Sequence, residues 1–315
     1  MDNIHVVMNP NSGHQIAHKL EPWLRMRLGR ECEILMIEPG VDAAAWARQK
    51  AESGASRILV MGGDGTFRSI ASALIGLETP VGLIPCGTNN NISSVLGMPA
   101  DTHEAVEVAL SAEPQWVSAG RIGCWREQGP PDSNDYIFFE GAGIGLEADL
   151  WPIGEAFVRR NFRDIIRAPL QLASDRSVDL VLEIDPPSER LTVKAFTMTI
   201  SNTPVTGQHL VLAPGIDMRD PALFLTVYHD LGRLNLVESA RALQHGHKGH
   251  GYTTTRYPFM RLKVESEHPF NVHADGTHIG TLPIDVVSIP MAIRVAMPAA
   301  AVVRAPALEP ATVLA

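Results

Sequence analysis

Short apolar runs and helical patterns alternate through the first 122 residues of this 315-residue chain. The apolar runs, which we expect to form β-strands, are Ile4–Met8, Glu33–Ile37, Arg57–Met61 and Val81–Pro85. Ile16–Leu28 and Ala43–Ala51 lie between them and carry apolar residues at helical spacing. Such alternation is typical of a parallel sheet that helices cover on both faces. We therefore predict a Rossmann-like, three-layer α/β domain over residues 1–124.

Residues 125–289 follow a different pattern, in which β-branched and aromatic runs are broken by Gly, Pro and Asp. The runs are Tyr136–Phe139, Val178–Ile184, Thr192–Ser201, Ala222–His229 and Met260–Ser266. This pattern favours an antiparallel β-sandwich or a barrel, and we predict a β-sandwich as the second domain. The Ala- and Pro-rich end of the chain, residues 307–315, is expected to be a flexible tail.

The residues Gly62-Gly63-Asp64-Gly65-Thr66-Phe67 join the third predicted strand to the next helical pattern. Glycines at such a junction let the backbone turn sharply and approach a ligand closely. The N–H groups and the dipole of the following helix favour a phosphate at the same point. Asp64 has a clear use there if it handles a metal ion or a proton. The alternative is a tight strand–helix turn without a ligand.

Two further polar loops follow predicted strands. Asn9-Pro10-Asn11-Ser12-Gly13 comes after the first strand, and Cys86-Gly87-Thr88-Asn89-Asn90-Asn91 after the fourth. Ligands of parallel α/β sheets bind at the carboxyl ends of the strands, so all three loops are expected at one edge of the sheet. Asn-Pro and Ser-Gly are also common turn formers, which leaves a simple turn open for the first loop.

The composition is that of an ordinary water-soluble protein, with 45% hydrophobic and 19% charged residues. A formal charge of −9 argues against broad nucleic-acid binding. The three cysteines have no metal-ligand spacing, which favours a reducing cytoplasm. No stretch reaches the roughly 18 apolar residues of a membrane helix. We therefore expect a cytoplasmic protein whose membrane contact, if it has any, is peripheral and at the inner face.

With its three loops in this order, the chain resembles the diacylglycerol-kinase-type lipid kinase family, which shares a superfamily with sphingosine and NAD kinases. Further segments of the chain look like motifs of that family. They are Leu96-Gly97-Met98-Pro99, Gly141–Ala148, Leu212–Asp220, Ala274-Asp275-Gly276-Thr277 and the pair Pro283 and Pro290. The resemblance therefore extends over almost the whole chain.

The resemblance implies an ATP-dependent lipid kinase that uses Mg²⁺ and transfers the γ-phosphoryl group of ATP to a hydroxyl of diacylglycerol or a related lipid. ATP would bind the first domain, which residues 290–306 would complete. The residues implied at the nucleotide are Asn9, Pro10, Asn11, Ser12, Gly13, Gly62, Gly63, Asp64, Gly65, Thr66, Phe67, Arg68, Gly87, Thr88 and Asn90. Asp64 and Asp275 are the implied catalytic acids, and Asp217 and Asp220 the implied metal-linked acids.

The chain departs from the family pattern at four places. Thr277 stands where the family has the glutamate that is commonly assigned as proton acceptor. Arg68-Ser69 replace Asn-Glu, Asn91 replaces an aspartate, and Pro221 replaces a glycine. Each lost acid removes a possible metal or proton ligand. The alternatives are therefore a kinase for a soluble acceptor such as NAD, or a catalytically silent nucleotide- or lipid-binding protein.

Each of two sets of charged residues has two possible interpretations. Asp217 and Asp220 are either linked to a metal ion or solvated turn residues. Arg159, Arg160, Arg163 and Arg167 are spaced to form one basic helix face. That face is either solvated or docks on anionic lipid headgroups. A homodimer is compatible with the sequence.

Overall fold

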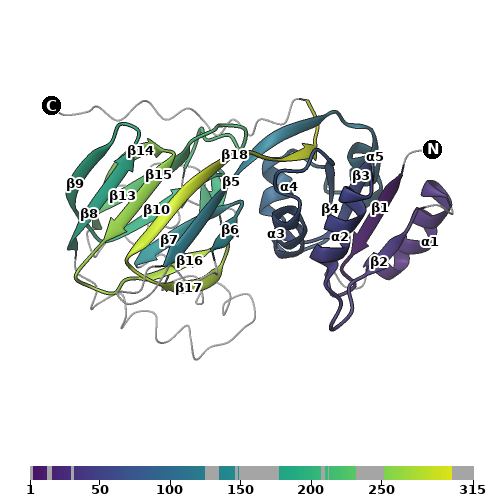
Figure 1. Ribbon diagram of the computed structural model, residues 1–315, viewed down its shortest axis with the longest axis horizontal. Helices are drawn as coiled ribbons and strands as arrows, with labels where there is room; N and C mark the ends of the chain where they lie inside the picture. The colour runs from purple at the N-terminus through teal and green to yellow at the C-terminus, as the bar shows by residue number, and fades with distance from the viewer. Residues whose placement is uncertain are drawn as a thin grey trace. The chain divides into compact units, whose positions relative to one another are not determined.

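The computed structural model describes the chain in segments, which are residues 3–12, 16–29, 32–124, 135–145, 148, 177–206, 210–211, 213–231 and 252–299. The chain divides into two compact units. The first unit contains the residues up to Ser118 and the segment that starts at Met291, and the second contains Ala119–Pro290. Figure 1 labels the helices and strands of both units.

The sheet of the first unit is parallel, and its strands carry almost continuous apolar residues. Its order is β2 (Ile34–Met36), β1 (Ile4–Met8), β3 (Arg57–Gly62), β4 (Val81–Pro85) and the end of β18 (Ile284–Ala296). Every residue of β4 is buried, as expected for a strand with neighbours on both sides and helices on both faces. The end of β18 joins the sheet beside β4, where Val295 pairs with Val81 and Ala296 with Gly82.

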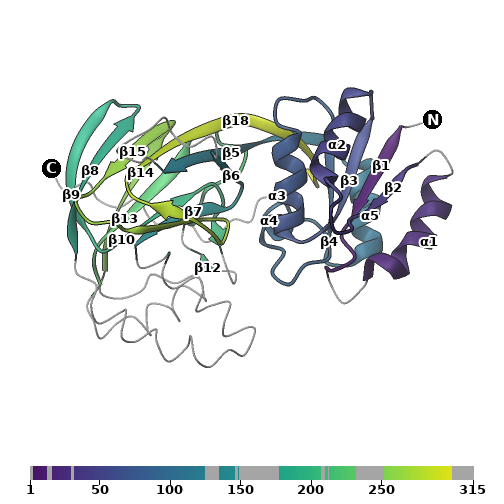
Figure 2. The same cartoon turned by 60° about the horizontal axis from the view of Figure 1, so that its bottom comes forward.

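Helices cover both faces of this sheet (Figure 2). They are α1 (Ile16–Leu28), α2 (Ala43–Glu52), α3 (Asp64–Ala73), α4 (Asn91–Val95) and α5 (Thr102–Ser111). On one face α1 and α5 are joined by the ion pair of Arg27 with Glu107, 2.9 Å long, and by the edge contact of Trp23 with His103. On the other face α2 packs against α3. The three-layer α/β fold predicted from the alternating pattern is confirmed.

The second unit contains two antiparallel sheets. The six-stranded sheet has the order β14 (Tyr252–Phe259), β13 (Leu223–Leu231), β10 (Thr197–Ser201), β7 (Gly141–Gly145), β16 (Asn271–Ala274) and β17 (Thr277–Thr281). In the other sheet the first part of β18 is followed by β15 (Arg261–Glu265), β8 (Val178–Asp185) and β9 (Glu189–Ala195). Short pairs are formed by β5 (Pro114–Cys124) with β6 (Tyr136–Phe138), and by β11 (Val205–Thr206) with β12 (Leu210–Val211).

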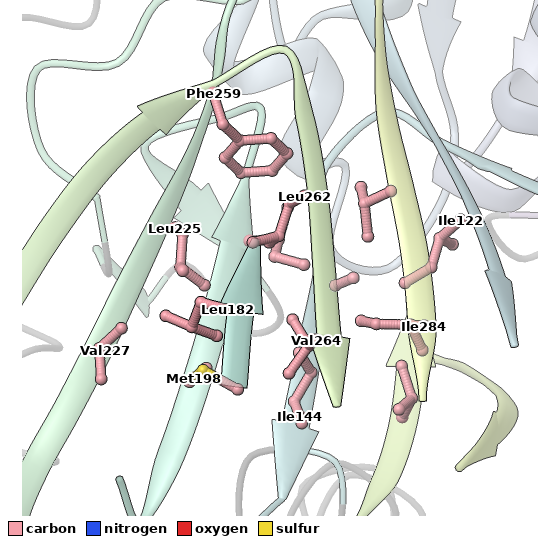
Figure 3. Close-up of a cluster of buried hydrophobic side chains, with 14 of the residues drawn as sticks. Ile122, Ile144, Leu182, Met198, Leu225, Val227, Phe259, Leu262, Val264 and Ile284 are labelled. Atoms are coloured by element: carbon pink, nitrogen blue, oxygen red, sulfur yellow. The ribbon is translucent and has the colours of Figure 1, made fainter. Parts of the chain in front are cut away.

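The core of the second unit lies between these two sheets (Figure 3). Ile144, Met198 and Leu225 point inward from the six-stranded sheet, and Leu182, Leu262 and Ile284 come from the other. All six side chains are buried, and each contributes about 1.5–3 kcal/mol to stability. The alternation of buried and exposed positions along β8 and β15 matches one buried face per strand. The predicted β-sandwich is confirmed.

No helix within the described segments is long and apolar enough to span a membrane. The four arginines expected on a basic helix face, Arg159, Arg160, Arg163 and Arg167, lie outside the described residues. Gly13 and Leu212 of the family motifs also lie outside them.

Candidate functional site

A pocket of about 620 Å³ lies within the first unit, at the carboxyl ends of the parallel strands. Its volume is in the range of small-molecule and cofactor sites. The described residues that line it are Asn9, Asn11, Ser12, Ile37, Val41, Asp42, Ala43, Ala44, Gly63, Gly65, Thr66, Ser69, Ile70, Gly87 and Thr88. The three polar loops named from the sequence are therefore brought together around one cavity.

Hydrogen bonds tie the first loop to the glycine loop. The side-chain amide of Asn9 donates to Thr66 Oγ1 at 2.8 Å, and the backbone N–H of Asn9 donates to the carbonyl of Met61 at 2.9 Å. The same side chain accepts the N–H of Asn11 at 3.0 Å, which closes an Asx turn. Asn9 thus holds both loops in position at the mouth of the pocket.

Glycine is required where the second and third polar loops cross. A Cβ on Gly87 would lie 2.6 Å from Gly63 Cα, and one on Gly62 would lie 2.6 Å from Thr66 Cβ. A Cβ on Gly65, by contrast, would meet no atom within 4 Å. Packing within the protein therefore explains the glycines at 62, 63 and 87. Gly65 faces open space in the pocket, where a ligand can approach the backbone of α3 closely.

The carboxylate of Asp64 links the glycine loop to helix α4. Its two oxygens accept the backbone N–H groups of Asn91 at 3.1 Å and Ile92 at 3.0 Å. These N–H groups belong to the first turn of α4, where an acceptor is needed. Asp64 therefore positions the loop that carries Thr88. Its predicted catalytic role stays a prediction.

Asn90 closes the third polar loop on itself. Its side chain accepts the N–H of Gly87 at 2.7 Å and donates to the carbonyl of the same residue at 2.9 Å. The backbone of Asn90 is left-handed, with φ of 52°, a conformation that asparagine tolerates better than most residues. Asn90 shapes the loop without lining the pocket.

Several residues predicted at the nucleotide are absent from the described lining of the pocket. They are Pro10, Gly62, Asp64, Phe67, Arg68 and Asn90. Phe67 is fully buried on the inner face of α3, which gives it a packing role. The remaining predicted residues with described positions, from Asn9 to Thr88, do line the cavity.

One wall of the pocket was missed in the sequence. Ile37, Val41 and Asp42 lie between β2 and α2, and Ala43 and Ala44 begin α2; all five line the cavity. They form no recognisable motif. The one signal in the sequence was their position directly after the second parallel strand, because ligands of such sheets bind at the carboxyl ends of the strands.

The electrostatics of the pocket come from the backbone more than from side chains. No lysine or arginine occurs among the described lining residues, and Asp42 is the one acid among them. Helix α3 begins after Gly63, which has no side chain to cap the first N–H groups. These groups and the helix dipole favour an anion. Burial raises the pKa of the adjacent Cys86 thiol to about 11, so this thiol stays neutral.

Asp275 lies in a tight turn of the second unit and has a clear structural role. Its carboxylate accepts three backbone N–H groups, from Phe139 at 2.9 Å, Glu140 at 3.0 Å and Gly141 at 3.1 Å. The side chain fastens the β16–β17 hairpin to the turn between β6 and β7. Its catalytic role stays a prediction.

Thr277, which stands where the resemblance predicts a glutamate, is exposed on the same hairpin. Its Oγ1 accepts a 2.8 Å hydrogen bond from the Tyr136 hydroxyl. A buried polar cluster lies beside the turn: Asn202 donates to the Phe139 carbonyl, and the carbonyl of Glu140 accepts the N–H of Asn202. Glu140 itself is 5% exposed. Sequence reasoning did not single out this cluster.

Asp217 and Asp220 lie close together in a turn, but Asp217 already has a cationic partner. Its carboxylate is hydrogen-bonded to the Arg219 guanidinium, and the N–H of Asp217 approaches Asp220 Oδ2 at 3.4 Å. Burial alone would raise the pKa of Asp217, but the hydrogen bonds from Arg219 outweigh it and lower that pKa. In the described part of the chain, no three Asp, Glu, His or Cys residues are grouped to hold a metal ion.

Two family models match the sequence. The diacylglycerol kinase catalytic domain matches residues 3–122, and the YegS C-terminal NAD kinase beta sandwich-like domain matches residues 156–297. Among curated relatives, a diacylglycerol kinase of Mycobacterium tuberculosis is 26% identical over 92% of this chain and 93% of its own length. An uncharacterized protein of Synechocystis sp. is 28% identical over 78% of this chain, which spans 55% of that protein.

Solved structures show the same fold at low sequence identity. A putative diacylglycerol kinase from Bacillus anthracis has a TM-score of 0.73 and 19% identity, and the match covers 96% of this chain and 99% of that one. A yeast NADH kinase complexed with NADH has a TM-score of 0.55 and 12% identity, with 94% and 83% covered. These likenesses concern the fold alone.

Proposed function

The chain belongs to the diacylglycerol kinase catalytic-domain family, and on this basis we propose that it is an ATP-dependent lipid kinase. The acceptor would be a hydroxyl of diacylglycerol or of a related lipid. The observation that carries the proposal is the pocket of the first unit, where three polar loops meet at the carboxyl ends of the strands. The names of the curated relatives support a lipid as the acceptor.

The pocket suits the phosphate end of a nucleotide. Gly65 leaves room for close approach, and the first N–H groups of α3 offer donors to phosphate oxygens. Asn9 and Thr66 hold each other in position beside these donors. Phosphoryl transfer depends on positioning and charge neutralisation more than on covalent chemistry, and these contacts supply the positioning.

Mg²⁺ is part of the proposal, because no described lining residue carries a positive charge to balance the phosphates. Bound to the phosphates, the ion would supply that neutralisation. Mg²⁺ usually keeps several waters and takes one or two carboxylates, so it needs no preformed cluster of acids. Asp217 and Asp220 of the second unit stay the proposed metal-linked acids, and Asp217 is hydrogen-bonded to the Arg219 guanidinium.

In the proposed reaction, the lipid hydroxyl oxygen forms a bond to the γ-phosphorus while the bond to the bridging oxygen breaks and ADP leaves. The hydroxyl proton passes to a carboxylate or to water. Transfer of labelled phosphate from ATP to diacylglycerol, to a panel of lipid extracts and to NAD tests this proposal. Label in NAD alone would favour a soluble acceptor. Binding of ATP without transfer to any acceptor would favour a silent protein.

Asp64→Asn is expected to lower kcat/KM for ATP by at least about tenfold, since the amide cannot accept both N–H groups of α4. The matched control is Asp101→Asn. Asp101 caps α5 by accepting the N–H groups of His103 and Glu104, and it is not among the described lining residues. Steady-state kinetics on both variants measure the effect. Equal activity of Asp64→Asn and the unaltered enzyme would contradict any role of Asp64 at this site.

A further inference from the structure

The two walls of the pocket differ in chemistry. The polar loops carry glycines, amides and hydroxyls, which suit phosphate oxygens. The wall formed by the β2–α2 connection and the start of α2 is apolar at Ile37, Val41, Ala43 and Ala44 and charged at Asp42 alone. Because like charges repel, a triphosphate is expected to avoid the wall that carries this acid. The nucleoside end of a bound nucleotide is then left to face it.

One of the two carboxylate oxygens of Asp42 can accept a hydrogen bond from a ligand. As the N-cap of α2, it accepts the N–H of Ala45 through Oδ1 at 2.9 Å. Within the described residues, its second carboxylate oxygen has no hydrogen-bond partner. The helix cap restricts the side chain of this lining residue, so a ligand that binds it has less conformational freedom to remove. A carboxylate oxygen accepts hydrogen bonds and donates none.

We propose that Asp42 is a specificity-determining residue that accepts a hydrogen bond from a ribose hydroxyl of the bound nucleotide. The proposal rests on the nucleotide-binding function proposed above. The neighbouring Ile37 and Val41 provide apolar surface for the base. The chemical class selected is a ribonucleotide with free ribose hydroxyls. A nucleotide with a phosphate on the ribose would bring a second negative charge against Asp42 and bind more weakly.

Calorimetric titration with ATP, 2′-deoxy-ATP and 3′-deoxy-ATP tests the proposal on the full chain. The unaltered protein is expected to bind ATP about tenfold more tightly than at least one deoxy analogue, as for a hydrogen bond to a charged group. In Asp42→Ser the preference for ATP disappears. Serine still caps α2 but loses the charge and the reach. Asp42→Asn, which also keeps the cap, is the second variant and is expected to show a reduced preference.

Glu38→Gln is the matched control, because it removes an exposed negative charge from the same connection and Glu38 is not among the described lining residues. It should keep the full preference for ATP. If ATP and both analogues bind the unaltered protein equally, or if Asp42→Ser keeps the preference, the inference on Asp42 is wrong while the nucleotide site stands. If Asp42→Ser changes the Mg²⁺ dependence of ATP binding but keeps the preference for ATP over the deoxy analogues, the inference on Asp42 is also wrong. If no nucleotide binds the folded protein, the proposed function itself fails.

Discussion

The tripeptide Asp-Gly-Thr occurs once in each unit and folds in two different ways. Asp64-Gly65-Thr66 begins helix α3 beside an open pocket. Asp275-Gly276-Thr277 forms a tight hairpin between β16 and β17, with Asp275 at φ 41° and Gly276 at φ 74°. In both, the aspartate accepts N–H groups from a distant segment, two at Asp64 and three at Asp275. The comparison teaches that the same short motif can hold a binding loop or fasten a turn.

The largest expected effect is at Asp275. Asp275→Ala leaves three N–H groups without their acceptor and should lower the free energy of unfolding of the second unit by about 3 kcal/mol. Chemical denaturation followed by near-ultraviolet circular dichroism measures it. Asp275→Asn keeps a residue that tolerates positive φ, and so separates the lost acceptor from backbone strain. A change below about 0.5 kcal/mol in Asp275→Ala would contradict the fastening role.

The two central glycines should respond in opposite ways. Gly276→Ala puts a side chain at φ 74° and should cost about 1–2 kcal/mol of stability. Gly65→Ala meets no protein atom and lies in a helix, so it should not destabilise the first unit. It should weaken ATP binding, because the new methyl group occupies ligand space. Thermal denaturation and calorimetric ATP titration of both variants test the contrast. Unchanged ATP binding in Gly65→Ala would place the ligand elsewhere.

The threonine of the second tripeptide, Thr277, leads to a prediction on catalysis. Thr277 is exposed and stands where the family has the glutamate assigned as proton acceptor. If that role is missing here, Thr277→Glu should raise kcat for lipid phosphorylation by about tenfold, short of the roughly 10²- to 10⁴-fold that a well-positioned general base contributes. Thr277→Gln is the control without a base. Equal rates in the two variants would show that the enzyme does not depend on a base at this position.

The smallest expected effect concerns Asp217, whose carboxylate accepts hydrogen bonds from both the guanidinium and the backbone N–H of Arg219. Its folded-state pKa lies below the ordinary value, so its stabilising effect is present above the unfolded pKa and is lost as the pH falls through the lowered one. Arg219→Gln should raise the pKa of Asp217 and cost less than about 1 kcal/mol near pH 7, since the pair is partly exposed. NMR titration of the Asp217 carboxyl measures the shift. No shift would mean that the ion pair does not form in solution.

Much of the fold could be predicted from the spacing of apolar residues along the sequence. Strand–helix alternation before residue 122 and turn-broken β runs after it correctly indicated the α/β and β-sandwich architectures. Asn9, Gly63, Thr66 and Thr88 were predicted at one edge of the sheet because each follows a parallel strand, and they line one pocket. The wall at Val41 and Asp42 was missed because its residues form no motif. Their contribution depends on the backbone path between β2 and α2.

The sequence by itself determined the two architectures, because the period of its apolar residues decides which faces can be buried. It also determined where three polar loops must meet, since parallel strands end at a common edge. Only the tertiary structure decided what each carboxylate does. Asp64 and Asp275 are both followed by Gly-Thr, yet their hydrogen bonds come from residues at least 27 and at least 134 positions away, respectively. The use of a buried polar group depends on which donors the fold brings within hydrogen-bonding distance, and these partners are set by chain segments far from the motif.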